Sequence, residues 1–238
     1  MPVFLAIETS QREGGVALCV GDGPVRVEPL GGAAERADVA LVPAIDRLCR
    51  QADQRPTDLD TVAVSIGPGG FTGLRLAVSV AKMLALSCGC DLVAVPSAFV
   101  VAESLREEIG ERPALVILAV KGDNFWATPL RAAASGWRSP GGALGDARSV
   151  TLADDAVVIG DEHLPASVRE RCIAASIEII PPRFDPAATL AEGRRLHHAG
   201  QTTGASELLP LYPRPPEAVT LWQSRRARDA ANRTAPDQ

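Results

Sequence analysis

The stretch SIGPGGFTGLRLAVSVAKMLALSCG, residues 65–89, decides the fold of this protein. An apolar segment runs into a glycine-rich turn, and a helix is predicted from Thr72, whose hydroxyl can cap the first turn. The polar side chains of this helix as far as Leu86 are Arg75, Ser79 and Lys82. Their spacing of four and three places them on one narrow stripe. A helix that is apolar around most of its circumference must be covered on more than one side, by its own chain or by a partner.

The glycine turn, residues 67–73, allows two interpretations. Backbone N–H groups and the helix dipole converge at such a junction, so Gly67, Gly69, Gly70 and Thr72 could contact an anion. However, the turn matches neither G-x-x-x-x-G-K-[ST] nor G-x-G-x-x-G, and it lacks the lysine of a P-loop. The glycines also allow a sharp turn and a close approach of helix to sheet. The spacing favours packing and leaves anion contact open.

The first apolar run, residues 3–10, ends in Glu8, Thr9 and Ser10. This ending is similar to the phosphate-binding start of actin-like ATPases, where an Asp is followed by Gly and Thr or Ser. Here Glu8 replaces the Asp, and no glycine precedes Ser10. We interpret the motif as the vestige of a nucleotide site.

The remaining patterns predict an α/β protein of two lobes. Apolar runs at residues 59–69 and 91–95 predict strands, and the run GDGP between two β-prone segments predicts a hairpin. Helices are expected at residues 35–53, kinked or beginning near Pro43, and from about Ser97.

A second lobe opens with apolar runs at 114–120 and 123–132. Residues 135–149 are expected to be a long, loop-rich passage, followed by a strand at 155–161 and a helix at 185–200. The domains predicted are residues 1–110, residues 111–212 and a proline-rich, charged tail at 213–238 that is partly disordered.

Composition excludes several classes of function. The net charge of −5 argues against a strongly basic nucleic-acid surface. The five scattered cysteines do not form a disulfide framework, which predicts thiols in a reducing cytoplasm. No apolar run reaches the ~20 residues that span a membrane, and the opening residues lack the basic region of a signal peptide.

Self-sufficient hydrolysis is not predicted either. The three histidines, His163, His197 and His198, show no H-E-x-x-H or H-x-x-x-H spacing, and no G-x-S-x-G turn occurs. The run Arg225-Arg226-Ala227-Arg228 could touch RNA phosphates, although such terminal charge runs are usually solvated.

The blocks FLAIETSQREGGVALCVGDG, LVPAIDRLCRQA, LDTVAVSIGPGGFTGLRLAVSVAKMLAL and LVAVPSAFVVAES together resemble the TsaB (YeaZ) family. The family's version of residues 67–75 typically has Ser at the position of Gly70. The resemblance implies an actin/hexokinase-like (ASKHA, ribonuclease H-like) fold of two lobes with mixed sheets flanked by helices. It also implies a non-catalytic subunit of the machinery that attaches threonylcarbamoyl to tRNA adenosine next to the anticodon.

In the family, TsaB pairs with the catalytic subunit TsaD through two helices of the first lobe, and the ATPase TsaE joins them. The resemblance implies a partner interface at Val39, Val42, Ile45, Leu74, Arg75, Val78, Ala81, Lys82 and Ala85. On this basis Leu84→Glu is expected to abolish pairing and to leave the monomer folded. The isolated chain could form a homodimer through the same helices.

The histidine pair that binds metal in TsaD corresponds here to Ser97 and Val101, which cannot bind iron or zinc. We therefore expect no cofactor in this chain, ATP or ADP and metal in its partner subunits, and only indirect contact with tRNA. The main alternative is an active ASKHA-fold ATPase or small-molecule kinase, and a stand-alone hydrolase is a distant third.

Overall fold

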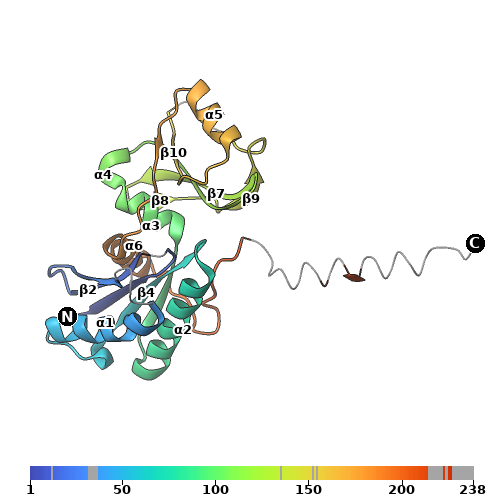
Figure 1. Ribbon diagram of the computed structural model, residues 1–238. Coiled ribbons are helices and arrows are strands. Elements are labelled where there is room, and N and C mark those ends of the chain that lie inside the picture. Colours follow the sequence, from blue (N-terminus) through green and yellow to red (C-terminus); the bar gives the residue numbers. More distant parts are fainter. Residues whose placement is uncertain are drawn as a thin grey trace, which may run out of the picture.

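The computed structural model describes residues 1–11, 13–31, 37–134, 136–151, 153, 155–213, 222, 225 and 226. The described residues form two lobes, one above the other in Figure 1, with helix α3 between them. The predicted tail, residues 213–238, lies almost wholly outside the described residues.

The first lobe is built on a five-stranded mixed sheet in the order β3-β2-β1-β4-β5. Strands β1 and β2 are antiparallel, as are β2 and β3, while β4 runs parallel to both β1 and β5. The predicted hairpin and the two later strands are therefore confirmed. The strands are β1 (Val3–Glu8), β2 (Gly14–Val20), β3 (Arg26–Leu30), β4 (Thr61–Gly67) and β5 (Asp91–Pro96).

Helices cover both faces of this sheet (Figure 1). Leu5 and Ile7 of β1 pack in one core with α1 (Ala37–Gln51) and α2 (Phe71–Cys88). Phe4 and Ala6 point to the other face and pack with α6 (Pro186–His198) and α3 (Ser97–Ser104). Because successive side chains of a strand alternate between faces, every residue of β1 is buried.

The second lobe has a six-stranded sheet in the order β11-β10-β6-β7-β8, with β9 paired to β7. Helices α3 and α4 pack with one of its faces, and α5 packs with the other. The elements are β6 (Ala114–Lys121), β7 (Asn124–Ala133), β8 (Gly136–Arg138), β9 (Ala143–Asp146), β10 (Val157–Ile159), β11 (Ile179–Ile180), α4 (Arg106–Ile109) and α5 (Ala166–Ala174). A short 3-10 helix, η1 (Pro56–Asp58), precedes β4 in the first lobe.

Helix α6 departs from the predicted domain boundaries. The boundary of 111–212 assigns it to the second lobe, but it packs on β1, β2, β4 and β5 of the first. The approach is close, since a Cβ on Gly193 would lie 2.2 Å from Cβ of Ala63. The chain therefore returns to the first lobe after β11.

The expected Thr72 cap was wrong, and two other local expectations are refined. Helix α2 begins at Phe71 with Gly70 as its N-cap, and no side chain caps it, so Thr72 lies inside the first turn. Pro43 lies within α1, which does not begin there. The segment 135–149 contains β8 and β9 rather than one long loop, because β7 is long enough to pair with both.

By length and composition α2 could cross a membrane, with a mean hydropathy of 1.4. It instead packs on β4, and its inward side is buried at Leu74, Ala77, Val78, Val80 and Ala81. Helix α2 is thus a core helix of a globular lobe.

Candidate functional site

The end of β1 points into the protein interior. Glu8 is fully buried, and its carboxylate accepts a hydrogen bond from the backbone N–H of Ser10 at 2.7 Å and from the Thr189 hydroxyl at 3.4 Å. Burial raises the pKa of Glu8, and the hydrogen bonds from Ser10, Ser65 and Thr189 partly offset that rise. The carboxylate is therefore bound to groups of its own chain, at the end of β1 and on α6. In this position it is unsuited to orienting a metal ion or a water molecule.

The glycine turn packs directly against the same strand end. The amide of Gly70 donates to the carbonyl oxygen of Ser10 at 2.7 Å, and the Thr9 hydroxyl donates to the carbonyl of Gly73 at 2.8 Å. A Cβ on Gly69 would lie 2.3 Å from the Ser10 oxygen, and one on Gly73 would lie 2.0 Å from the Thr9 oxygen. Because Gly69 and Gly73 have no Cβ, the carbonyl oxygens of Ser10 and Thr9 can lie against them.

The contacts of the glycine turn differ from those of a phosphate-binding loop. In such a loop, backbone N–H groups at a helix N-terminus face the anion. Here carbonyl oxygens of Thr9 and Ser10 occupy the space beside Gly69 and Gly73, and they carry partial negative charge. The structure brings six of the predicted residues together where β1, β4 and α2 meet: Glu8, Thr9, Ser10 and Gly67 are buried there, and Gly69 and Gly70 lie at its exposed edge. The seventh, Thr72, is exposed on α2.

Ser97 and Val101, the positions that the resemblance matches to a metal-binding histidine pair, both make contacts within the protein interior. Ser97 is buried, and its hydroxyl lies 3.0 Å from that of Ser65. Val101 is buried in the core of the second lobe. Among the described residues, no group of three His, Cys, Asp or Glu side chains could hold a metal ion.

The thiols of the first lobe are unpaired. Burial raises the pKa of Cys49 and of Cys90 to about 11, so both remain protonated at neutral pH.

The predicted interface residues divide into two groups. Ile45, Leu74, Val78 and Ala81 are buried within the first lobe and cannot contact a partner directly. Their hydrophobicity serves the internal core, which corrects that part of the prediction. The others reach the surface at least in part: Val39, Val42, Arg75, Lys82 and Ala85.

Three large apolar side chains on α2, absent from the predicted set, are exposed, and Phe71 at the first position is 50% exposed. Met83 is 51% exposed and Leu86 is 80% exposed, on the same outward stripe as Arg75 and Ser79. On α1, Val39 is 63% exposed. The pattern 75, 79, 83 and 86 could have indicated this stripe, but the sequence alone does not tell which side of an apolar helix faces its sheet.

The N-terminal end of α2 carries an aromatic cluster. The Arg75 guanidinium lies 3.6 Å above the centroid of the Phe71 ring, and its Nε donates to the hydroxyl of Tyr212 at 2.9 Å. Tyr212 comes from the C-terminal segment, so sequence reasoning could not associate it with α2.

A cleft of about 1070 Å³ lies between the lobes. Its lining includes Glu13 from the first lobe, and Asp161, His163, Arg169 and Arg183 from the second. Acidic and basic side chains are mixed, and Glu8 is not among the residues that line it. No local sequence pattern indicates this cleft, because the residues that line it are far apart along the chain.

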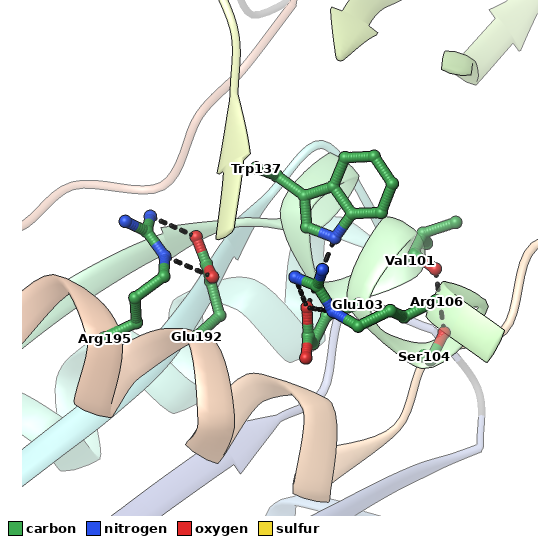
Figure 2. Close-up of polar contacts among 7 residues, drawn as sticks. All are labelled: Val101, Glu103, Ser104, Arg106, Trp137, Glu192 and Arg195. Carbon is green, nitrogen blue, oxygen red and sulfur yellow. Dashed lines mark hydrogen bonds and ion pairs between the residues drawn. The ribbon is translucent and has the colours of Figure 1, made fainter. Parts of the chain in front are cut away.

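Where the two lobes meet, a buried carboxylate forms an ion pair (Figure 2). Glu192 of α6 is 1% exposed and pairs with Arg195 at 2.5 Å. Nearby, Glu103 of α3 pairs with Arg106 at 2.5 Å and accepts a hydrogen bond from the Trp137 indole at 3.2 Å. Burial raises the pKa of Glu192, and Arg195 lowers it in turn.

Comparisons with known proteins find similarity to TsaB proteins and to TsaD-like transferases over part of the chain. The family model described as TsaD, tRNA N6-adenosine threonylcarbamoyltransferase, matches residues 30–125. The tRNA threonylcarbamoyladenosine biosynthesis protein TsaB of Bacillus subtilis is 37% identical over 94 residues, which is 40% of this chain and 41% of that protein. The TsaB of Escherichia coli is 26% identical over 125 residues, 52% of this chain and 53% of that protein. The matched segments thus span about half, or less, of these relatives.

Solved structures extend the likeness to both lobes. YeaZ from Pseudomonas aeruginosa superposes with a TM-score of 0.73 at 21% identity, covering 89% of this chain and 100% of that one. The predicted two-lobed α/β fold of the ASKHA class, with mixed sheets flanked by helices, is confirmed.

Proposed function

We propose that the chain, which is similar to TsaB and to TsaD-like proteins, takes part in threonylcarbamoyladenosine modification of tRNA. Its role is that of a non-catalytic scaffold that binds and supports a TsaD-like subunit. The observation that carries this proposal is the exposure of large apolar side chains on α1 and α2, the helices that cover one face of the first sheet.

The exposed apolar residues fit an interaction surface. Val39 and Val42 of α1 and Met83 and Leu86 of α2 are each at least half exposed. Clustered exposed apolar side chains on the helices of a folded domain typically mark a site of association. Since the inward sides of both helices are already buried against the sheet, their outward sides remain for a partner.

The strand-end joint supports a non-catalytic role. Glu8 is buried against Ser10 and Thr189, and the glycine turn is filled by the chain's own carbonyl oxygens. Catalysis of phosphoryl transfer depends on groups that face the phosphates and a metal ion. We therefore assign ATP or ADP and the metal to the partner subunits.

The remaining partners follow from the same proposal. A TsaE-like ATPase joins the pair, and tRNA contacts this subunit only indirectly, in keeping with a net charge of −5. In the absence of the TsaD-like subunit, the same helices support a homodimer. The proposed location is the cytoplasm, where tRNA is modified.

One observation favours the alternative of an active ATPase or small-molecule kinase. The cleft between the lobes, about 1070 Å³, is large enough for a nucleotide. Its carboxylates and cations come mostly from the second lobe, whereas Glu8 stays outside it. The two functions differ in whether this chain alone turns over ATP.

The test combines light scattering with an ATPase assay. The purified protein is mixed with the TsaD-like subunit of the same organism, and the mass of the complex is measured, together with ATP turnover by each protein alone. A one-to-one complex, with no turnover by this chain, is expected. Metal-dependent turnover by this chain alone, without a complex, would establish the alternative.

Two variants locate the surface. Leu86→Glu places a charge on the outward side of α2, and Ile173→Glu places one on α5 of the second lobe, where Ile173 is 70% exposed. Leu86→Glu should prevent pairing, and Ile173→Glu should leave it intact. Equal pairing by both variants would contradict the assignment of the surface to α1 and α2.

A further inference from the structure

Arg75 is held in one orientation on the surface of α2. Its guanidinium carbon lies 3.6 Å from the centroid of the Phe71 ring and 5.8 Å from that of Tyr212. The two rings lie 5.4 Å apart, and the Tyr212 hydroxyl accepts the Nε–H of Arg75 at 2.9 Å. An exposed arginine normally keeps many rotamers, but stacking and a hydrogen bond restrict this one.

The backbone near Tyr212 is itself fixed. The N–H of Leu211 donates to the carbonyl of Ile66 at 2.7 Å, beside the glycine turn at the end of β4. A Cβ on Gly67 would lie 3.1 Å from the Leu211 carbonyl oxygen. The C-terminal segment thus holds Tyr212 against α2 from outside the helix.

The outer nitrogens of this guanidinium, Nη1 and Nη2, are available for a ligand as far as the described part of the chain is concerned. Among the described residues, neither Nη1 nor Nη2 of Arg75 makes a hydrogen bond or ion pair. Helix α2 contains no Asp or Glu, and its second cation, Lys82, likewise forms no ion pair with the described residues. The outward side of α2 is therefore positive in a protein whose net charge is −5.

The chemistry of the surroundings points to a carboxylate rather than to nucleic acid. A surface that follows a phosphate backbone needs several clustered Lys and Arg side chains. Here one fixed arginine is accompanied on α2 by exposed apolar side chains, Phe71, Met83 and Leu86. An arginine fixed beside aromatic rings within an apolar surface is typical of the residues that dominate protein–protein interfaces.

We propose that Arg75, fixed by Phe71 and Tyr212, anchors the protein partner of α2 by binding a carboxylate side chain end-on through Nη1 and Nη2. This inference rests on the proposed pairing through α1 and α2, and it specifies an acidic residue in the partner. Since the orientation of Arg75 is set before binding, less side-chain entropy is lost when the two hydrogen bonds form. The N-terminal end of α2 carries the positive end of the helix dipole, which also favours a negatively charged ligand.

The experiment measures the dissociation constant of the complex with the TsaD-like subunit by calorimetry. Arg75→Lys keeps the charge and loses the planar fork, and Tyr212→Phe keeps the ring and loses the hydrogen bond. We expect Arg75→Lys to weaken binding about 10-fold or more and Tyr212→Phe about 3-fold. Lys82→Gln, which removes the other cation of the same helix, should change binding by less than about 3-fold. Unfolding temperatures of all variants confirm that they are folded.

The outcomes separate this inference from the proposed pairing. If the wild-type proteins do not associate, both are overturned. If they associate and Arg75→Lys binds as tightly as the wild type, the pairing stands and the carboxylate anchor is overturned. It is also overturned if Arg75→Lys leaves protein pairing unchanged but weakens binding of tRNA by the complex, because the ligand would then be phosphate.

Discussion

The carbonyl oxygen of Ser10 accepts a hydrogen bond from the amide of Gly70 at 2.7 Å and lies where a Cβ of Gly69 would be. One backbone oxygen at the end of β1 thus fills the inside of the glycine turn before α2. The turn that suggests an anion site in the sequence is, in the folded chain, the joint that holds helix and sheet together.

A first prediction follows for the glycines of this joint. Gly73→Ala and Gly69→Ala would place a methyl group 2.0 Å and 2.3 Å from backbone oxygens of Thr9 and Ser10. Since backbone cannot move away freely, each should lower the free energy of unfolding by about 1–3 kcal/mol or more. Urea denaturation measures the change.

Gly70→Ser is the matched control. A Cβ at Gly70 meets only the Ser10 oxygen, at 3.6 Å, and serine is a better N-cap than glycine. It should be neutral or stabilising by a few tenths of a kcal/mol. Equal destabilisation at all three positions would contradict the account of the joint.

A second prediction separates surface from core on α2. Leu84 is half-buried and packs against the core, so Leu84→Glu should lower the free energy of unfolding by about 2–3 kcal/mol. Leu86 is 80% exposed, and Leu86→Glu should change it by less than about 0.5 kcal/mol. Leu86→Glu, rather than Leu84→Glu, is therefore the variant expected to disturb pairing while the monomer stays folded. Thermal and urea unfolding of the isolated monomer distinguish the two, and similar losses in both would place Leu86 in the core.

A third prediction concerns pH. The pKa of Glu8 is raised above its ordinary value of 4.5 by burial, so the folded state disfavours the ionised form. The wild type should therefore lose stability from this group as the pH rises above 4.5 and through the folded-state pKa. Glu8→Gln removes the titration, so its free energy of unfolding relative to the wild type should increase as the pH rises from about 4 to 8.

Urea unfolding of both proteins at several pH values between about 4 and 8 gives the difference between their free energies of unfolding. The contributions of the other titrating groups cancel in this difference. A difference that falls with rising pH would mean that the ionised carboxylate is stabilised in the folded protein, as a metal-binding site requires.

A fourth prediction addresses the joint between the lobes. Arg195→Met keeps the packing of the aliphatic stem and removes the ion pair with the buried Glu192. Without the charge that lowers it, the pKa of Glu192 rises further. The loss of stability should therefore be larger at pH 8, where the unpaired Glu192 carboxylate is charged, than at pH 5.

Arg194→Met serves as the control, because Asp22, the partner of Arg194, is almost fully exposed. Its effect on stability should hardly change with pH, since an exposed carboxylate stays hydrated when its partner is removed. A pH-independent cost for Arg195→Met would show that Glu192 is not the partner that matters.

Sequence patterns identified most elements of the first lobe because local signals there are consistent. The β1 run, the hairpin, the glycine turn and the apolar α2 each combine suitable periodicity with turn residues, and all are present. Prediction was poorer in the second lobe, where short elements depend on their pairing and packing partners rather than on a local pattern. Strands β8 and β9 are stabilised by pairing with β7, and α5 has only a weak apolar pattern and is set by packing on β10.

For the site, the order of residues establishes which side chains are available: an acid and two hydroxyls at the end of β1, a glycine turn, and a helix with two cations and no acid. What these groups contact depends on the folded arrangement of the chain. The carbonyls of Thr9 and Ser10 enter the glycine turn because β1 and β4 are neighbours, and Tyr212 reaches Arg75 because the C-terminal segment returns along β4. Burial of four predicted interface residues follows from which side of each helix faces the sheet, and that choice depends on packing of the whole lobe rather than on any local pattern.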